Sequence, residues 1–235
     1  MSGLAMATCG ELLSAAEHRL VGSLSLRPMK LDPGLAEAQG LWRGSPASLV
    51  THAYRGPRIS YARFATLKSD GLEFGNVLCL PKSSFEVPIL GADLVDLGRG
   101  TAMIAADLSP TTPATHLDTA FSERLQRAQD GLTPGGELPE WCRRCFSAVP
   151  LYTRFTMNQM PRAADALWAY VIAFTELLAV AKAAPRASDR VSEAQRVYCA
   201  AHLRDDKGLG LLKTMFGEPW AERYLCQVLF PGPQL

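Results

Sequence analysis

Five short runs rich in apolar, aromatic and β-branched residues lie between positions 48 and 107 and constrain the fold most strongly. Turn signals containing Gly, Pro and Ser separate them, at 56–57, 69–71, 82–84 and 98–100. Connections this short cannot hold the crossover helix that parallel strands need, so neighbouring strands are expected to be antiparallel. The predicted strands are Leu49–Tyr54, Ile59–Leu67, Leu72–Leu80, Pro88–Val95 and Thr101–Asp107.

Helical spacing of apolar residues predicts helices on both sides of this strand block. One covers residues 9–21, and a connector punctuated by Pro and Gly follows it through residues 28–46. Ser188 with Asp189 is expected to begin one of the later helices, and Gly208 with Gly210 to end it. The later helices are predicted at Asp118–Ala128, Ala163–Ala183, Ser188–Asp205 and Pro219–Leu229. This order indicates an α+β or a layered α/β/α domain with an antiparallel sheet.

Composition excludes several classes of function. The 235 residues carry a net charge of +1, which gives no general case for nucleic-acid binding. The apolar run at 166–181 is shorter than the ~20 residues that cross a bilayer and contains Glu176, which favours a core helix. Six scattered cysteines and four histidines show neither a disulfide framework nor the spacing of metal ligands. No signal peptide is evident, so we expect a cytoplasmic protein without a membrane anchor.

Asp93 is the most informative single residue. It is the one carboxyl in the apolar segment Pro88-Ile-Leu-Gly-Ala-Asp93-Leu-Val95. Burial disfavours the charged form, so a carboxyl in such a place is expected to have a raised pKa and to act as a proton donor. The alternative is an Asp at a strand end or bulge that backbone N–H groups satisfy.

Three segments together give the chain a family resemblance. They are Gly71-Leu-Glu-Phe-Gly-Asn76-Val-Leu-Cys-Leu-Pro81, the Asp93 segment running on to Ala105-Ala-Asp107-Leu-Ser-Pro110, and Asp205-Asp206-Lys207 through Phe230. In order and spacing they resemble the ferredoxin-dependent bilin reductases, most nearly the phycocyanobilin:ferredoxin oxidoreductase branch, with features of phycoerythrobilin synthases. The likeness is good over about residues 58–110 and 200–230 and loose elsewhere.

The resemblance implies one domain over residues 1–235, an α/β fold of the three-layer α/β/α sandwich type with a central antiparallel sheet. It implies an oxidoreductase that acts on CH–CH groups, with the iron–sulfur protein ferredoxin as electron donor. Biliverdin IXα would bind between the sheet and the C-terminal helices and pass through bilin radicals, with no bound metal, flavin or nicotinamide. It further implies a monomer and, as the source of biliverdin, a haem oxygenase upstream.

Carried over position by position, the resemblance assigns roles to particular residues. Asp93 matches the central-strand proton donor, and Asp206 matches a second essential acid on a C-terminal element. Lys207 matches a basic residue that pairs with a propionate, and a flexible ammonium suits that anion. Thr101 and Trp141 are expected to contact the bilin. Without the family context, Asp205-Asp206-Lys207-Gly208 would be interpreted as a solvated helix end.

Three departures from the phycocyanobilin-forming enzymes bear on the product. A histidine that meets the central Asp there is Asn76 here, and Tyr61-Ala-Arg-Phe-Ala65 lacks the glutamate used for the exovinyl group. A propionate-binding arginine is replaced by Gly136. Asn76 can donate a hydrogen bond but cannot shuttle a proton at neutral pH, and the phycoerythrobilin- and phytochromobilin-forming relatives carry Asn there.

The sequence therefore predicts reduction of biliverdin IXα to phycoerythrobilin through 15,16-dihydrobiliverdin, with Asp93, Asp206 and Asn76 as catalytic residues. The alternatives are 15,16-dihydrobiliverdin alone, phytochromobilin or phycocyanobilin as product, another linear tetrapyrrole as substrate, and a non-catalytic bilin carrier. Clustering in sequence makes four basic residues candidates for ferredoxin contact: Arg55, Arg58, Arg63 and Lys68.

Overall fold

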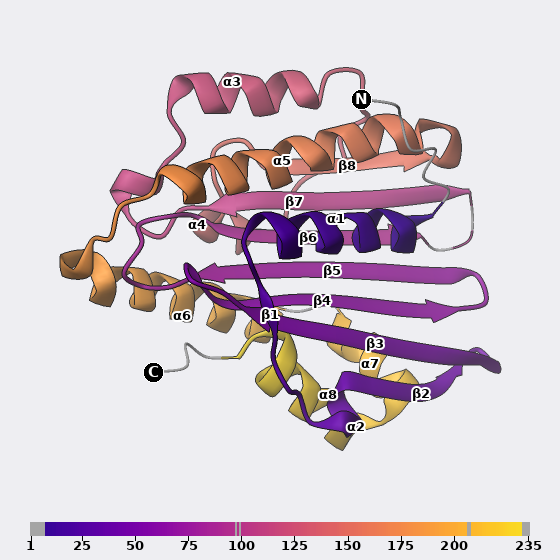
Figure 1. The fold of residues 1–235 in the computed structure, drawn as a ribbon. Coiled ribbons are helices and arrows are strands. Elements are labelled where there is room, and N and C mark those ends of the chain that lie inside the picture. Colours follow the sequence, from indigo (N-terminus) through magenta and orange to yellow (C-terminus); the bar gives the residue numbers. More distant parts are fainter. Residues whose placement is uncertain (1–7, 97, 99, 206–207, 232–235) are drawn as a thin grey trace.

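A central antiparallel sheet forms the middle of the molecule in the computed structural model (Figure 1), which describes residues 8–96, 98, 100–205 and 208–231. Strands β3 to β8 follow one another across the sheet in chain order, while β1 and β2 both pair with the outer edge of β3. The strands are β1 (Arg27–Pro28), β2 (Glu37–Trp42), β3 (Ser45–Arg55), β4 (Ile59–Ser69), β5 (Leu72–Pro81), β6 (Ile89–Asp96), β7 (Thr101–Ser109) and β8 (Leu151–Thr156).

Helices cover both faces of this sheet. On the face turned to the viewer of Figure 1 lie α1 (Cys9–Ser23), α3 (Thr119–Ala128) and α5 (Met160–Val180). The other face carries α4 (Cys142–Cys145), α6 (Ser188–Asp205), α7 (Gly208–Phe216), α8 (Glu218–Tyr224) and the π-helical turn η4 (Leu225–Leu229). Short elements connect these: α2 (Pro33–Ala36), η1 (Pro113–Thr115), η2 (Met157–Gln159) and η3 (Pro185–Ala187). The three-layer α/β/α prediction is confirmed.

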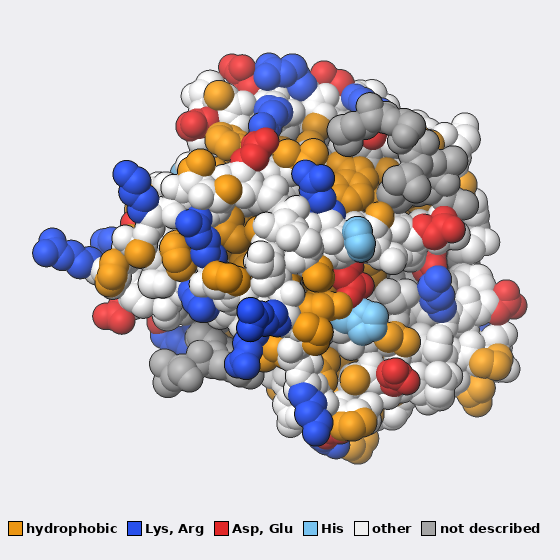
Figure 2. Space-filling model, in the orientation of Figure 1, with side chains coloured by type: hydrophobic (Ala, Val, Ile, Leu, Met, Phe, Trp, Pro, Cys, Tyr) orange, Lys and Arg blue, Asp and Glu red, His pale blue; other side chains and the backbone are white. Residues whose placement is uncertain are grey.

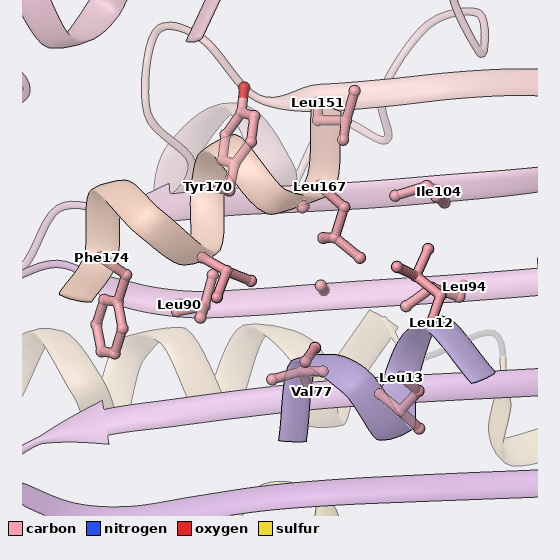
Figure 3. Packing of buried hydrophobic residues seen from close by; sticks show 14 of the residues in the cluster. Leu12, Leu13, Val77, Leu90, Leu94, Ile104, Leu151, Leu167, Tyr170 and Phe174 are labelled. Atoms are coloured by element: carbon pink, nitrogen blue, oxygen red, sulfur yellow. The ribbon is translucent and has the colours of Figure 1, made fainter. Parts of the chain in front are cut away.

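Alternation along each strand divides the core into two clusters. Residues such as Leu90, Leu94 and Ile104 face α1 and α5, where they pack with Leu167 and Phe174 (Figure 3). Each such buried side chain contributes about 1.5–3 kcal/mol. The intervening residues, which include Asn76 and Asp93, therefore point to the face covered by α6, α7 and α8.

The helix α5 packs as a core element. Together with the preceding turn, α5 forms the segment Met157–Val180. By length and composition it is the one helix among the described residues that could span a membrane. Its residues Leu167, Tyr170 and Phe174 are nevertheless buried against the sheet. Glu176, which interrupts the apolar run, faces outward and accepts a 2.5 Å hydrogen bond from Arg124 of α3.

All five predicted strands are present, with ends within a few residues of those expected. The structure corrects the expectation for 28–46, which contains α2 and β2 rather than only a connector. It also adds β8, and it places Gly208 and Gly210 inside α7, so these glycines do not end α6. Ser188 is already helical and hydrogen-bonds Ser83 at 2.7 Å between the two Oγ atoms instead of capping α6.

Candidate active site

A cavity of about 400 Å³ lies between the sheet and the C-terminal helices. This volume is within the range of ~300–1,000 Å³ typical of small-molecule sites. Strands β3 to β8 form its floor, and the segment 138–146, α6, α7 and η4 form its walls. Its lining is mostly apolar, with two acids, Asp93 and Asp205, and neither Lys nor Arg among the described residues. The arrangement suits a large, flat, mostly apolar ligand.

Asn76 and Asp93 meet on the floor of this cavity. They are directly opposed partners on β5 and β6, and the Asn76 Nδ2 amide donates a hydrogen bond to Asp93 Oδ1. Antiparallel register places opposed side chains on the same face of a sheet, which is why residues 17 positions apart come into contact. Asp93 lies in a strand whose apolar neighbours Ala92 and Leu94 are buried, as predicted, while Asp93 itself is partly buried.

Arg63 of β4 completes this polar group and was misinterpreted from the sequence. Its side chain is fully buried, so it cannot belong to a ferredoxin-docking surface. Its Nη1 donates to Asn76 Oδ1 and its Nη2 donates to the Leu229 carbonyl oxygen at 3.1 Å, while its buried Nε has no partner among the described residues. Its position at a strand centre between apolar neighbours, Ala62 and Phe64, was the available signal that this cation points inward.

His202 of α6 also lines the cavity, and no motif or spacing in the sequence singled it out. Its ring stacks on Phe230 with centroids 4.6 Å apart and makes an edge contact with Trp141 at 4.4 Å. Burial, and secondly the charge of Arg63, lower its pKa to about 3, so the imidazole is neutral at pH 7. Its buried Nε2 atom has no hydrogen-bond partner among the described residues.

Asp107 of β7 is the carboxyl that burial affects most plainly. It is 2% exposed, and this burial raises its pKa. Ser109 Oγ donates to it at 2.7 Å, while the backbone N–H and Oγ of Ser147 donate at 2.9 and 2.5 Å. Asp107 is not among the residues that line the cavity, but its bonds to Ser147 anchor the wall segment that ends at Phe146.

The other residues predicted for the site have different positions. Trp141 lines the cavity with Leu138 and Pro139. Thr101 begins β7 and is exposed; it shares a face with the lining residues Met103 and Ala105 but lies beyond them. Asp206 and Lys207 lie outside the described residues, and their neighbours Asp205 and Gly208 line the cavity.

The proposed ferredoxin-contact cluster is not a cluster in space. Arg55 ends β3 and Arg58 precedes β4, whereas Lys68 lies at the far end of β4, paired with Glu73 at 2.9 Å. Strands rise ~3.4 Å per residue, so the two ends of β4 are roughly 30 Å apart. On the face shown in Figure 2, Lys and Arg side chains are spread over the surface and do not form one patch.

Comparison with known proteins agrees with this fold. A sequence profile described as ferredoxin-dependent bilin reductase matches residues 13–231. The chain is therefore a member of the ferredoxin-dependent bilin reductase family, oxidoreductases that act on bilins, as its sequence motifs predicted.

The chain is similar to relatives that are named for different bilin products. It is 30% identical to a phycocyanobilin:ferredoxin oxidoreductase of Synechococcus sp. over 89% of this chain and 87% of the relative. It is 27% identical to a phycoerythrobilin:ferredoxin oxidoreductase of Gloeobacter violaceus, over 93% of each chain. The fold is similar to phytochromobilin synthase from tomato, crystallised with biliverdin, with a TM-score of 0.83 and 21% identity, covering 96% of this chain and 83% of that one.

Proposed function

We propose that this protein reduces biliverdin IXα to phycoerythrobilin through 15,16-dihydrobiliverdin, with reduced ferredoxin as the electron donor. The observation that carries the proposal is the hydrogen-bonded pair Asn76–Asp93 on the floor of an apolar cavity, in a member of the bilin reductase family. A carboxyl group in contact with a bound bilin can deliver protons, while ferredoxin delivers electrons one at a time.

The reaction balances as two successive two-electron steps. The first adds two electrons and two protons across the C15=C16 bond and yields 15,16-dihydrobiliverdin. The second adds two electrons and two protons to the A-ring diene system and yields phycoerythrobilin. Each step needs proton donors near different carbons, and the mechanism assigns Asp93 and Asp206 to the A-ring step.

Asn76 supports the choice of product. Where a histidine beside the central Asp could exchange a proton, an amide can only hold a hydrogen bond. In addition, the β4 residue that pairs with Asn76 is Ala65. This position therefore offers no acid for exovinyl reduction. Reduction to phycocyanobilin is therefore disfavoured, although relatives with that activity are about as similar to this chain as the phycoerythrobilin-forming one.

Several further properties complete the proposal. The protein acts in the cytoplasm as a monomer, takes biliverdin from an upstream haem oxygenase, and uses no bound metal, flavin or nicotinamide. Lys207 pairs with a bilin propionate, and Trp141 and Thr101 contact the pigment. The position of Trp141 in the cavity lining supports its proposed contact with the pigment.

Anaerobic turnover with biliverdin and reduced ferredoxin, with products separated by chromatography, tests the function. We expect phycoerythrobilin from the natural protein, with dihydrobiliverdin as a transient species. Asp93→Asn should lower turnover by at least about 100-fold, the scale of a lost general acid. In the Asp206→Asn variant the reaction should stop after the first step, and 15,16-dihydrobiliverdin should accumulate.

Other outcomes of this experiment contradict the proposal in distinct ways. Phycocyanobilin as the sole product would overturn the argument from Asn76. Tight biliverdin binding without any ferredoxin-dependent change in absorbance would indicate a bilin carrier instead. Unimpaired phycoerythrobilin formation by Asp206→Asn would remove the role given to that residue.

A further inference from the structure

The buried cation Arg63 has no place in the proposed chemistry, yet it contacts the residue that contacts Asp93. It is the largest fully buried side chain among the described residues. Transfer of a guanidinium out of water is costly unless it is well hydrogen-bonded, and truncation of a buried charged group is correspondingly disruptive. Its bonds to Asn76 and to the Leu229 carbonyl, and its position 5.8 Å from the Phe230 ring centroid, stabilise it.

The direction of these hydrogen bonds determines how the Asn76 amide is oriented. An Asn side chain has one end that accepts and one that donates, whereas a guanidinium can only donate. Because Arg63 donates to Oδ1 of Asn76, the amide must turn its Nδ2 group to Asp93. Without Arg63, an Asp93 that holds its proton could donate it to Oδ1 of an amide rotated by half a turn, so the orientation would be fixed only while Asp93 is ionised.

The amide orientation in turn determines how Asp93 can carry a proton. Asp93 Oδ1 accepts the N–H of Asn76, so this oxygen has to keep a lone pair toward the amide. A proton held by Asp93 is therefore placed on Oδ2. Once Asp93 has given its proton to the bilin, the N–H bond and the nearby guanidinium both stabilise the carboxylate that remains.

We propose that Arg63 is a positioning residue that acts through Asn76 to orient Asp93 and to stabilise its carboxylate after proton donation. This inference rests on the proposed function. The three residues come from adjacent strands β4, β5 and β6, so the rigid sheet holds the chain of hydrogen bonds in line. Arg63 also ties η4 to the sheet through Leu229, and it thereby connects a cavity wall to the proton donor.

A double-mutant cycle tests this role. Arg63→Met, which keeps the apolar stem of the side chain but removes every donor, should lower the single-turnover rate about 10- to 100-fold. The Kd for biliverdin, from absorbance titration, should change less than about threefold. In an Asn76→Leu background the same Arg63→Met change should cost less than about twofold, because Arg63 has then lost the group through which it acts.

Matched variants keep the result interpretable. Arg63→Lys restores a group that can only donate, so it should recover most of the rate. Arg63→Gln places an amide that can either donate to or accept from Asn76, so it should recover less. If Arg63→Met does not fold, the Lys and Gln variants are compared in both backgrounds. Arg124→Met, on the opposite face of the sheet, is the control and should leave turnover unchanged.

Two outcomes would overturn the inference. Losses that multiply fully in the double mutant would show that Arg63 does not act through Asn76. A lower melting temperature with an unchanged rate per folded molecule would show a purely structural role. Absence of biliverdin reduction by the natural protein in the same assay would instead contradict the proposed function.

Discussion

At the scale of single residues, the same burial has opposite consequences for an acid and a base. Burial raises the pKa of Asp107 and lowers that of His202, because in both cases it disfavours the charged form. The sequence directed attention to Asp93 for this effect, but among the described residues the most deeply buried carboxyl is Asp107, 2% exposed and hydrogen-bonded to Ser109 and Ser147. Three donors hold this carboxyl in place, and its bonds to Ser147 anchor a cavity wall.

His202 should make stability depend on pH in a defined window. Its folded-state pKa of about 3 lies below the ordinary 6.5, so the unfolded chain binds the proton first as the pH falls. Its contribution is complete above pH 6.5 and is lost between pH 6.5 and about 3, with a slope of up to about 1.4 kcal/mol per pH unit.

Urea unfolding at pH 7, 6 and 5 compares the natural protein with His202→Phe, which keeps an aromatic ring on Phe230. Between pH 7 and 5 the variant should gain about 1–2 kcal/mol relative to the natural protein. Asp107 titrates in both proteins and cancels in the comparison. His116→Phe, at an exposed position, is the control, and equal pH slopes in all three proteins would contradict the prediction.

At the scale of elements, a close approach between β2 and α7 sets one wall of the cavity. A Cβ atom added at Gly40 of β2 would lie 2.1 Å from the Met215 carbonyl oxygen of α7. Backbone cannot yield as a side-chain tip does, so only glycine permits this contact. Both elements were missing from the sequence prediction, β2 within the expected connector and α7 beyond the expected helix end.

Gly40→Ala should therefore move α7 away from β2. We expect a loss of about 1–3 kcal/mol in the free energy of unfolding, the usual scale for overpacking. Biliverdin binding should also weaken, because Gly208, Leu211 and Leu212 of α7 line the cavity. Gly22→Ala in α1, where nothing lies within 4 Å of the added Cβ, should be neutral or stabilising.

Urea unfolding and absorbance titration with biliverdin measure both effects. Unchanged affinity together with reduced stability in Gly40→Ala would show that the position of α7 does not shape the pigment site. Unchanged values of both quantities would show that the β2–α7 contact is not as close as described.

At the scale of the whole molecule, the cavity lies at the boundary between two layers, so its occupant should stabilise the complete fold. A ligand at about 100 times its Kd adds about 2.7 kcal/mol, which corresponds to a rise of roughly 5–10 °C in the Tm of a domain this size. The two core clusters lie on opposite faces of one sheet, and only the face with α6, α7 and α8 contains the cavity.

Ala105→Leu should abolish this stabilisation by filling the floor of the cavity. Ala105 lies opposite Asp93 in the β6–β7 register, and a larger side chain there occupies space that the pigment needs. The variant should keep its own Tm within a few degrees yet show no rise when biliverdin is added. Ala179→Leu, exposed on α5 beyond the other face, should respond like the natural protein; a normal rise in Ala105→Leu would place the pigment elsewhere.

Patterns along the chain were sufficient to predict the five central strands, their antiparallel order, the main helices and the family. These features depend on local signals: alternation, turn residues, helical spacing and three motifs whose spacing can be read along the chain. The sequence also identified Asn76 and Asp93 separately, but antiparallel order alone does not fix the register that pairs them.

Packing in three dimensions sets the register that joins Asn76 to Asp93, the inward direction of Arg63, the place of His202 in the cavity wall and the contact of Gly40 with α7. These depend on which face of a strand meets which helix, and on backbone approaches between residues up to 175 positions apart, as between Gly40 and Met215. No local pattern encodes such contacts, because they arise from packing the whole chain around one sheet.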